Sequence, residues 1–316
     1  MKHLISPFKR LKDFGLLGMN RRNSAYILEQ NPRALYPFID DKLKTKKLLM
    51  EHGLPTPELY LKIEYFFQIQ KLKNEDLPDS FALKPATGSA GRGIIIIKHK
   101  TEEGWQTTSG QTLTLDEIHY HLANILAGMF SLGGVTDKAF FEYCIHFHRS
   151  LVDISFQGVP DVRVILYRGM PIMSMLRLPT KESDGKANLH QGAVGVGVDM
   201  ATGLTFGGVH HNRVVSQHPD THKNIDGVLV PEWNTLLEIA AKIYPVFPLG
   251  YIGVDFVVDE NLGPLILELN ARPGLNIQLA NQTGLLPRLR KIDALPFAVE
   301  TLSASQKLAL LKEKIF

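Results

Sequence analysis

Gly250-Tyr-Ile-Gly-Val-Asp-Phe-Val-Val-Asp-Glu-Asn-Leu-Gly-Pro-Leu-Ile-Leu-Glu-Leu-Asn-Ala-Arg-Pro-Gly274 is the stretch that decides the fold. Two apolar runs, 250–258 and 264–269, flank a short stretch rich in turn-forming residues, so the segment predicts a β-hairpin. Asp255 lies in the first run, and Glu268 and Asn270 lie in the second. Because Glu268 and Asn270 are two residues apart, both project from one face of a strand, and the hairpin brings Asp255 near them.

These three side chains predict a metal site. Two carboxylates and an amide oxygen suit Mg²⁺, which proteins usually hold with one or two carboxylates plus substrate phosphates. The alternative is a polar strand face that is turned to water. The flanking Ile, Val, Phe and Leu residues favour the metal site, because an acid inside an apolar run normally needs a partner.

Length and composition restrict the class of protein. The chain has 316 residues, enough for two or three lobes. Its net charge is +3, with 35 Lys and Arg against 32 Asp and Glu, which gives no general case for nucleic-acid binding. The single cysteine, Cys144, excludes an internal disulfide framework and a Cys-rich zinc site, and it fits a reducing compartment. No apolar run reaches the length of a signal peptide core or a transmembrane helix, so we expect a cytoplasmic protein.

The N-terminus is basic and interleaved with apolar residues. The basic residues are Lys2, Lys9, Arg10, Lys12, Arg21 and Arg22. This pattern predicts an amphipathic helix that contacts a membrane surface or a partner, or alternatively one that packs on the body of the protein.

Histidines suggest a second, weaker metal hypothesis. A zinc site is conceivable from His210 and His211 with His218 and His222. Only His218 and His222 have the spacing of a helical ligand pair, and Pro219 lies between them, which disfavours this site.

The remaining pattern predicts layered α and β structure. We expect helices over most of 1–40 and over 40–53, 113–132 and 230–246, and strands over 79–85, 94–98, 139–145, 162–167, 171–178 and 193–199. Strands cluster and helices are segregated, which is typical of an α+β fold and not of an alternating parallel sheet.

A glycine-rich turn follows one of these strands. The sequence Phe81-Ala-Leu-Lys-Pro-Ala-Thr-Gly-Ser-Ala-Gly-Arg-Gly93 places Lys84 at a strand end before several glycines. The glycines allow backbone N–H groups to approach an anion closely, and the lysine can reach the same anion. The turn is neither a Walker A loop nor a dinucleotide-binding turn. The alternative is a glycine-rich hairpin that binds nothing.

Three further segments carry polar side chains at predicted strands or loops. Arg163, two residues after Asp161, and Arg177 in a neighbouring strand favour a bidentate clamp on phosphate or carboxylate, with a structural ion pair as the alternative. The strand around Glu142 has two interpretations: a connector that presents its backbone to an adenine edge, or an edge strand with an exposed acid. The loop from Asn188 to Ala193 suits a segment that closes on a transferring phosphoryl group.

Taken in order, these motifs resemble the ATP-grasp superfamily and, within it, the RimK-type α-L-glutamate ligases and the α-L-glutamate ligase-like proteins. The likeness runs from about Asp40 to Leu279, and Glu268-Leu-Asn-Ala-Arg-Pro-Gly274 is its most specific part. It implies an α+β ATP-grasp fold in which two lobes grip ATP between antiparallel sheets. The division it implies is a helical segment at 1–55, a small lobe at 56–145 and a large lobe with the metal site at 146–316. A short helical segment stands where RimK-type enzymes carry a whole α/β domain.

The resemblance also implies site residues. ATP contacts would come from Lys42, Lys84, Gly88, Ser89, Gly91, Arg92, Gly93, Glu142, Tyr143, Cys144 and Asp153. Catalytic contacts would come from Arg163, Arg177, Asn188 and Arg272. The Mg²⁺ ligands would be Asp255, Glu268 and Asn270, with Mn²⁺ able to substitute.

The implied activity is an ADP-forming carboxylate–amine ligase that makes an amide or peptide bond through an acyl phosphate. It would add glutamate or another amino acid to a small-molecule, peptide or protein amine, without nucleic acid, and a homo-oligomer is compatible with this activity. Phosphoryl transfer depends mainly on positioning and charge neutralisation, so no side-chain nucleophile is required. Two alternatives stay open: an ATP-grasp kinase that phosphorylates a hydroxyl, and a nucleotide-binding regulatory or scaffold protein.

Overall fold

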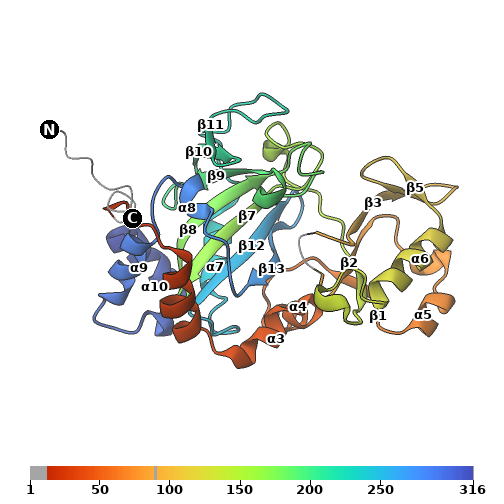
Figure 1. Cartoon of the computed structure of the whole chain (residues 1–316), viewed down its shortest axis with the longest axis horizontal. Coiled ribbons are helices and arrows are strands. Elements are labelled where there is room, and N and C mark those ends of the chain that lie inside the picture. The colour runs from red at the N-terminus through yellow and green to blue at the C-terminus, as the bar shows by residue number, and fades with distance from the viewer. Residues whose placement is uncertain (1–12, 89–90, 316) are drawn as a thin grey trace. The chain divides into compact units, whose positions relative to one another are not determined.

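The computed structural model describes residues 13–88 and 91–315 (Figure 1). It divides into two compact units. The small unit comprises Asp40–Lys47 and Thr56–His146, and the large unit comprises 13–39, Leu48–Pro55 and 147–315. Helix α4 (Lys42–Glu51) begins in the small unit and ends in the large one. Each unit is built on an antiparallel sheet of its own.

The sheet of the small unit has six strands in the order β1-β6-β2-β3-β4-β5. They are β1 (Leu59–Ile63), β2 (Phe81–Pro85), β3 (Ile95–Lys100), β4 (Trp105–Thr107), β5 (Thr112–Leu113) and β6 (Ala139–Glu142). Helices α5 (Phe66–Lys71) and α6 (Leu115–Leu126) share one apolar core with this sheet. Helix α6 begins at a capping box between Thr114 and Glu117 and buries Ile118, Leu122 and Ile125, which recur at helical spacing.

The sheet of the large unit has seven strands in the order β11-β10-β9-β8-β7-β12-β13. They are β7 (Asp161–Tyr167), β8 (Met170–Leu178), β9 (Val194–Val198), β10 (Thr205–His210), β11 (Arg213–Val215), β12 (Tyr251–Asp259) and β13 (Gly263–Asn270). The helices of this unit are α2 (Met19–Arg21), α3 (Tyr36–Ile39), α7 (Trp233–Ala241), α8 (Ile277–Ala280), α9 (Leu286–Asp293) and α10 (Ala304–Leu310).

Both faces of the larger sheet are covered, which explains why its strands are apolar almost without interruption. Val164 of β7 packs in a core that includes Leu236 of α7. The next residue, Ile165, packs in a second core that includes Leu289 of α9, because alternate strand residues point to opposite faces. By the same alternation, Asp161 and Arg163 project from the face of Ile165. The polar side chains of β7 therefore share a face with the α9 side of the core.

The predicted α+β class with antiparallel sheets is confirmed. The strands expected over 162–167, 171–178, 193–199 and the 250–274 hairpin correspond to β7, β8, β9, β12 and β13. The strand expected over 139–145 is shorter and ends at Glu142. Helix α6 ends well before residue 132, because Gly128 has a left-handed φ of 84° that stops the helix.

Several elements were not predicted. They are β1, α5, β10, β11 and the helices after residue 276. Strand β10 was not predicted because it contains Gly207 and Gly208, and glycine is depleted in strands. The helix expected over 230–246 is also confined to Trp233–Ala241.

The N-terminal segment packs on the large unit as far as the structure describes it. Leu17, Tyr26 and Ile27 are buried in the core on the α9 side of the sheet. Of the six basic residues singled out above, Lys2, Lys9, Arg10 and Lys12 lie outside the described residues, so the contacts expected of them stay predictions. None of the helices over 13–88 and 91–315 has the length and apolarity needed to cross a membrane.

Candidate functional site

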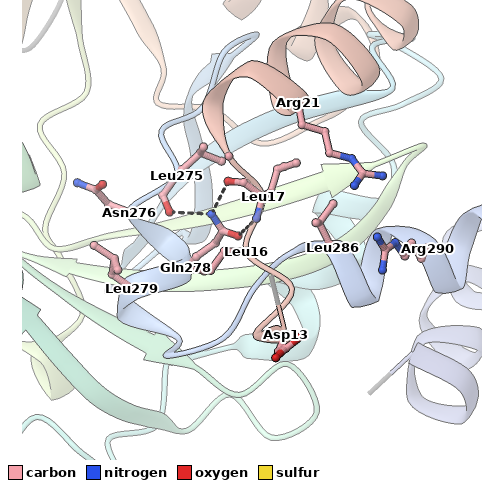
Figure 2. Close-up of a pocket in the computed structure, with 11 residues that line it drawn as sticks. Asp13, Leu16, Leu17, Arg21, Leu275, Asn276, Gln278, Leu279, Leu286 and Arg290 are labelled. Atoms are coloured by element: carbon pink, nitrogen blue, oxygen red, sulfur yellow. Dashed lines mark hydrogen bonds between the residues drawn. The ribbon is translucent and has the colours of Figure 1, made fainter. Parts of the chain in front are cut away.

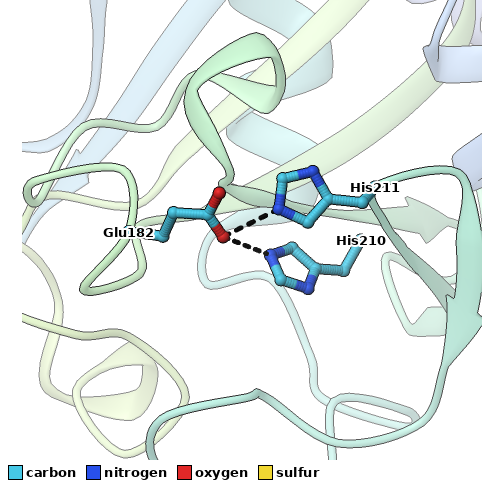
Figure 3. Close-up of side chains that lie close together, drawn as sticks. All are labelled: Glu182, His210 and His211. Atoms are coloured by element: carbon cyan, nitrogen blue, oxygen red, sulfur yellow. Dashed lines mark hydrogen bonds and ion pairs between the residues drawn. The ribbon is translucent and has the colours of Figure 1, made fainter.

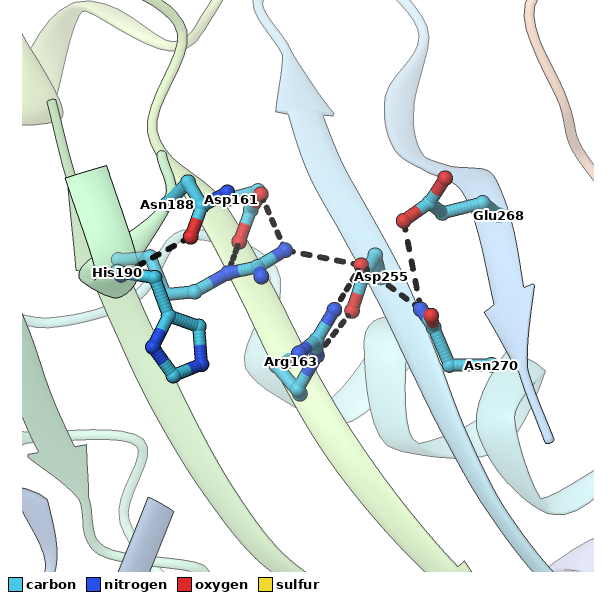
Figure 4. A network of polar contacts seen from close by, with 8 residues as sticks. Asp161, Arg163, Asn188, His190, Asp255, Glu268 and Asn270 are labelled. Carbon is cyan, nitrogen blue, oxygen red and sulfur yellow. Dashed lines mark hydrogen bonds and ion pairs between the residues drawn. The ribbon is translucent and has the colours of Figure 1, made fainter. Parts of the chain in front are cut away.

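A network of carboxylates and guanidiniums lies across four neighbouring strands of the large unit (Figure 4). Asp255 of β12 lies opposite Arg163 of β7, and Asp161 of β7 lies opposite Arg177 of β8. Arg163 donates from Nε to Asp255 Oδ1 at 2.7 Å and from Nη2 to Oδ2 at 2.5 Å. Arg177 donates two hydrogen bonds to Asp161 and a third, of 2.9 Å, from Nη2 to Asp255 Oδ2. The arginines expected as clamps are therefore bound in ion pairs within the sheet.

The hairpin adds Glu268 and Asn270 to this network. Asp255 pairs with Glu268 directly across β12 and β13, as the sequence predicts. The Asn270 amide donates from Nδ2 to Asp255 Oδ2 at 3.1 Å and to Glu268 Oε1 at 3.4 Å. The three side chains proposed as metal ligands are thus brought together by the pairing of two adjacent strands.

The network carries one carboxylate more than it has guanidiniums. Over the described residues, Asp161 and Asp255 form ion pairs with Arg163 and Arg177, and Glu268 lies opposite Asp255 on the next strand. Burial by itself raises the pKa of Asp255, but Arg163 and Arg177 outweigh it and hold that pKa below its ordinary value, so Asp255 is ionised. Burial, with a further contribution from the charge of Asp255, raises the pKa of Asp161 to about 7 despite Arg177. Carboxylate and amide oxygens with excess negative charge suit a hard divalent cation such as Mg²⁺.

Three other predicted site residues of the large unit make different contacts. Asn188 accepts a hydrogen bond from the backbone N–H of His190 at 3.0 Å and caps a short 3₁₀ turn (Figure 4). Arg272 is exposed and stacks its guanidinium over the Tyr36 ring at 5.2 Å, lining a hollow of about 600 Å³. Asp153 is exposed in a loop. Over the described residues, no hydrogen bond joins these three side chains to the network.

The small unit contains a buried charge cluster that the sequence only partly indicates. Glu142 lies on β6, which is flanked by β1 and β2, and is 2% exposed. The edge-strand alternative is therefore wrong. Lys84 of β2 binds Glu142 Oε1, and Lys46 of α4 binds Oε2 at 2.8 Å. Lys46, which sequence reasoning missed, also donates to Thr56 Oγ1 at 3.0 Å.

Burial disfavours the charged forms of Glu142 and Lys46, and their ion pairs act in the opposite direction. Burial raises the pKa of Glu142, but Lys84 and Lys46 outweigh it and hold that pKa below its ordinary value. Burial also lowers the pKa of Lys46, although Glu142 acts in the opposite direction. Glu142 therefore holds Lys84 and Lys46 in place, and its contact with ATP stays a prediction.

The glycine-rich turn follows Lys84 directly. Lys42 Nζ donates to the carbonyl of Gly88, and the Lys42 backbone N–H donates to the carbonyl of Ala86 at 2.9 Å. A side chain at Gly88 would lie 2.3 Å from the Pro85 ring, and Gly93 has a left-handed φ of 74°, so both positions require glycine. Gly91 and Arg92 belong to the same turn, whereas Ser89 lies outside the described residues.

The segment after β6 is held by its backbone. The Tyr143 N–H donates to the carbonyl of Glu58 at 2.8 Å, and its ring lies 5.9 Å from the ring of His146. Cys144 is buried.

A separate pocket of about 820 Å³ lies in the large unit between the N-terminal segment and helices α8 and α9 (Figure 2). Leu17 and Gln278 hold the two sides together: the Leu17 N–H donates to Gln278 Oε1 at 2.8 Å, and Gln278 Nε2 donates back to the Leu17 carbonyl at 3.1 Å. Arg21 and Arg290 line the pocket together with leucines. Sequence reasoning missed this pocket, because its walls are more than two hundred residues apart along the chain and carry no shared motif.

Comparison with known families decides the identity of the fold. The family described as sugar-transfer associated ATP-grasp matches residues 21–294. This chain belongs to the sugar-transfer associated ATP-grasp family. The ATP-grasp superfamily expected from the order of the motifs is thereby confirmed, and the two antiparallel sheets are those of the ATP-grasp fold.

Solved structures with a similar fold include several ligases. The chain is 12% identical to the ATP-grasp ligase PsnB in complex with minimal precursor, Mg and ADP, with a TM-score of 0.45, covering 89% of this chain and 62% of that one. It is 14% identical to D-alanine–D-alanine ligase from Bacillus anthracis complexed with ATP, with a TM-score of 0.40, covering 88% and 66%. It is 12% identical to an L-amino acid ligase from Bacillus licheniformis, with a TM-score of 0.42, covering 86% and 48%.

The chain spans about three fifths of the PsnB chains that it matches, between 59% and 62% of their length. No curated protein matches the sequence.

Proposed function

We propose that this chain is an ATP- and Mg²⁺-dependent ligase that joins a carboxylate to an amine through an acyl phosphate. The observation that carries the proposal is the convergence of Asp255, Glu268 and Asn270 on two paired strands, in a chain of the ATP-grasp family. Two carboxylates and an amide group that are brought together on one strand pair favour a bound divalent cation.

Asp255, Glu268 and Asn270 would hold the ion. When bound, Mg²⁺ would neutralise phosphate charge and polarise the transferring group. The guanidiniums of Arg163 and Arg177 keep Asp255 ionised and fix its orientation. Each of them also has an Nη1 group that donates no hydrogen bond to another described residue, and we assign these donors to the transferring phosphoryl oxygens.

The small unit would bind the nucleotide. Lys84 lies near the end of β2, just before the glycine-rich turn. The backbone N–H groups of this turn and the positive charge of the lysine suit the phosphates of ATP. The buried carboxylate of Glu142 binds Lys84 and holds it in place. The backbone of Tyr143 and Cys144 is proposed for the adenine edge, and Asp153 for the ribose.

The reaction needs no covalent enzyme intermediate. A substrate carboxylate oxygen attacks the γ-phosphorus of ATP, the bond to the β-phosphate oxygen breaks, and ADP leaves. The amine nitrogen then attacks the acyl carbon, phosphate departs with the bonding electron pair, and the amine loses a proton. Positioning and charge neutralisation supply most of the acceleration in such phosphoryl transfers.

The substrate proposal follows from two sources. The resemblance to RimK-type enzymes favours glutamate or another amino acid, joined to a small-molecule, peptide or protein amine. The description of the family associates it with sugar transfer, so we extend the proposal to an acid or amine that is carried on a sugar. We assign the pocket beside Arg21 and Arg290 to the substrate carboxylate, since guanidiniums bind carboxylates bidentately.

The test is ADP and phosphate release by the purified chain with ATP and Mg²⁺ or Mn²⁺, over pools of amino acids, uronic acids, amino sugars and peptides. Mass spectrometry of the products identifies the substrates. A condensed product with one phosphate released per bond supports the ligase. Glu268→Gln should lower turnover by about 100-fold or more. Glu238→Gln, on the exposed side of α7, is the matched control and should keep full turnover.

Two outcomes would overturn this proposal. A phosphorylated acceptor without phosphate release would identify a kinase. Bound ATP without turnover over every pool would favour a regulatory protein.

A further inference from the structure

Glu182, His210 and His211 converge in the large unit, apart from the carboxylate–guanidinium network (Figure 3). Glu182 Oε2 lies 2.7 Å from His211 Nε2 and 3.6 Å from His210 Nε2. The three ligand atoms all lie within 4.8 Å of one another. Glu182 belongs to the loop after β8, His210 ends β10, and His211 begins the turn from β10 to β11.

The turn explains how two consecutive histidines reach one point. His210 pairs with Arg213 across β10 and β11, so His211 and Asn212 form a two-residue turn with φ values of 47° and 60°. Consecutive strand residues would point to opposite faces, but this left-handed turn rotates the second imidazole back. The two rings lie only 4.3 Å apart between centroids. Asn or Gly would be the ordinary residues at a left-handed position, and a histidine occupies the first one.

The loop that carries Glu182 is held from within. Thr180 Oγ1 donates to the Gly192 carbonyl at 2.9 Å, and Ser183, which is 1% exposed, donates from Oγ to the Thr180 carbonyl at 3.1 Å. The carboxylate of Glu182 rests on Gly192, where a Cβ would lie 2.8 Å from Glu182 Cδ. Glu182 is thereby directed at the histidines by the two ends of its own loop.

One buried nitrogen of this cluster has no hydrogen bond among the described residues. His210 Nε2 is buried and has no hydrogen-bond partner over the described residues, and its distance to Glu182 Oε2 is too long for one. Glu182 Oε2 is used by His211. A buried ring nitrogen that points at a second imidazole and a carboxylate is the arrangement expected of a ligand, because a metal ion would satisfy all three atoms together.

The zinc site considered from sequence, with His218 and His222, is wrong in its membership. His218 Nε2 contacts the Pro179 carbonyl at 2.9 Å, and its Nδ1 accepts from the backbone N–H groups of Asp220 and Thr221, so both ring nitrogens are used. The side chain that does join His210 and His211 is Glu182, which lies 28 residues before His210. Nothing in the local sequence pattern connects them.

We propose that Glu182, His210 and His211 bind a divalent transition metal ion, with Zn²⁺ as the ion that best fits two imidazoles and one carboxylate. Three protein ligands leave a fourth position open, and the side chains of Glu182 and His211 are 57% and 52% exposed, so water can occupy it. The ion fastens the loop 180–192 to the β10–β11 turn. Since that loop also carries Asn188, the metal restricts a segment adjacent to the proposed active site residues. The three proposed Zn²⁺ ligands are distinct from the proposed Mg²⁺ ligands, and Zn²⁺ binding by them does not require the ligase activity.

The experiment is calorimetric titration of the untagged full chain with Zn²⁺, in excess Mg²⁺ so that the network around Asp255 does not compete. We expect one Zn²⁺ per chain. His211→Asn keeps a residue that tolerates the left-handed turn but removes the ligand, and should weaken binding by about 100-fold or more, since loss of even an outer-shell partner costs about 10- to 100-fold. Glu182→Gln and His210→Gln should weaken it similarly.

The matched control is His222→Asn, which changes another exposed histidine with a left-handed φ, of 56°. It should bind Zn²⁺ as the unmodified chain does. Hydrogen exchange provides a second measurement: Zn²⁺ should slow exchange over 180–192 in the unmodified chain and in His222→Asn, but not in His211→Asn. The proposal would be overturned if the unmodified chain did not bind one Zn²⁺ per chain. It would also be overturned if the three ligand variants bound Zn²⁺ as tightly as the unmodified chain does.

Discussion

Glu142→Gln is the change that most directly tests the buried charge cluster of the small unit. It keeps the size of the side chain but removes the carboxylate that Lys46 and Lys84 share. The two lysine side chains are 6% and 14% exposed, so water cannot replace the lost charge. The variant therefore leaves two uncompensated ammonium groups beside each other.

The expected cost follows from this burial. Removing one partner of a buried ion pair costs about 3–5 kcal/mol. The lysines could avoid this cost only by losing a proton. At pH 7 that costs about 4.6 kcal/mol for a lysine with an ordinary pKa near 10.4, at about 1.36 kcal/mol per unit. Burial already lowers the pKa of Lys46, so the deprotonation of Lys46 costs less free energy. We expect Glu142→Gln to lower the free energy of unfolding by about 3–4.5 kcal/mol.

Glu64→Gln is the matched control in the same unit. Glu64 also binds two lysines, Lys62 at 2.6 Å and Lys138 at 3.2 Å, but these are 48% and 44% exposed. Exposed ion pairs contribute about 0–1 kcal/mol. The same chemical change should therefore cost no more than about 1 kcal/mol at this site.

The chain offers a specific probe for the assay. It has two tryptophans, Trp105 in the small unit and Trp233 in the large unit. In a Trp233→Phe background, fluorescence during urea unfolding reports on the small unit alone, and the free energy follows from the midpoint and the slope.

The pH dependence of the free energy of unfolding provides an independent test of the buried cluster. The pKa of Glu142 in the folded chain is below its ordinary value of 4.5, so its stabilising contribution is complete above that pH and is lost as pH falls through the lower folded value. The difference in the free energy of unfolding between the unmodified chain and Glu142→Gln should therefore become smaller as the pH falls. Equal, small costs for both variants, or a difference that grows in acid, would refute the assignment of a buried, charged cluster.

Three further predictions concern activity. Glu268→Gln should lower Mg²⁺-dependent turnover by about 100-fold or more while unfolding changes by no more than about 1 kcal/mol, measured by ADP release and urea unfolding; retained turnover would remove Glu268 from the metal site. Lys84→Ala should weaken ATP binding by about 10- to 100-fold in a fluorescent-nucleotide titration, whereas the fold persists because Lys46 still neutralises Glu142. Arg290→Ala should raise KM for the substrate acid by about 10- to 100-fold with KM for ATP unchanged; a change confined to kcat would exclude the pocket as the acid site.

Local pattern in the sequence was sufficient for the hairpin that carries Asp255, Glu268 and Asn270. Two apolar runs around a turn dictate antiparallel pairing, and a period of two places the polar residues on one face. The structure has this pairing, with Asp255 opposite Glu268. The neighbouring strands β7 and β8 were predicted for the same reason, but the partners of Arg163 and Arg177 were not, because either a ligand or a carboxylate could satisfy a guanidinium.

Other features depended on contacts between distant segments. Lys46 lies in a run of lysines on a helix, and nothing local distinguishes it from its exposed neighbours until the helix meets β6 and Glu142. The pocket beside Arg21 joins segments from opposite ends of the chain through Gln278.

By itself, the sequence determined the α+β class, the hairpin with its three ligand candidates, the glycine-rich turn after Lys84 and the ATP-grasp superfamily. The first three follow from periodicity and turn chemistry, which act over a few residues, and the superfamily follows from the resemblance of the ordered motifs. Only the tertiary structure decided which charges are paired, that Glu142 is buried between two lysines, and that Glu182 meets His210 and His211. Those outcomes depend on strand order and on a left-handed turn, and no local pattern encodes which distant side chains a packed sheet brings within bonding distance.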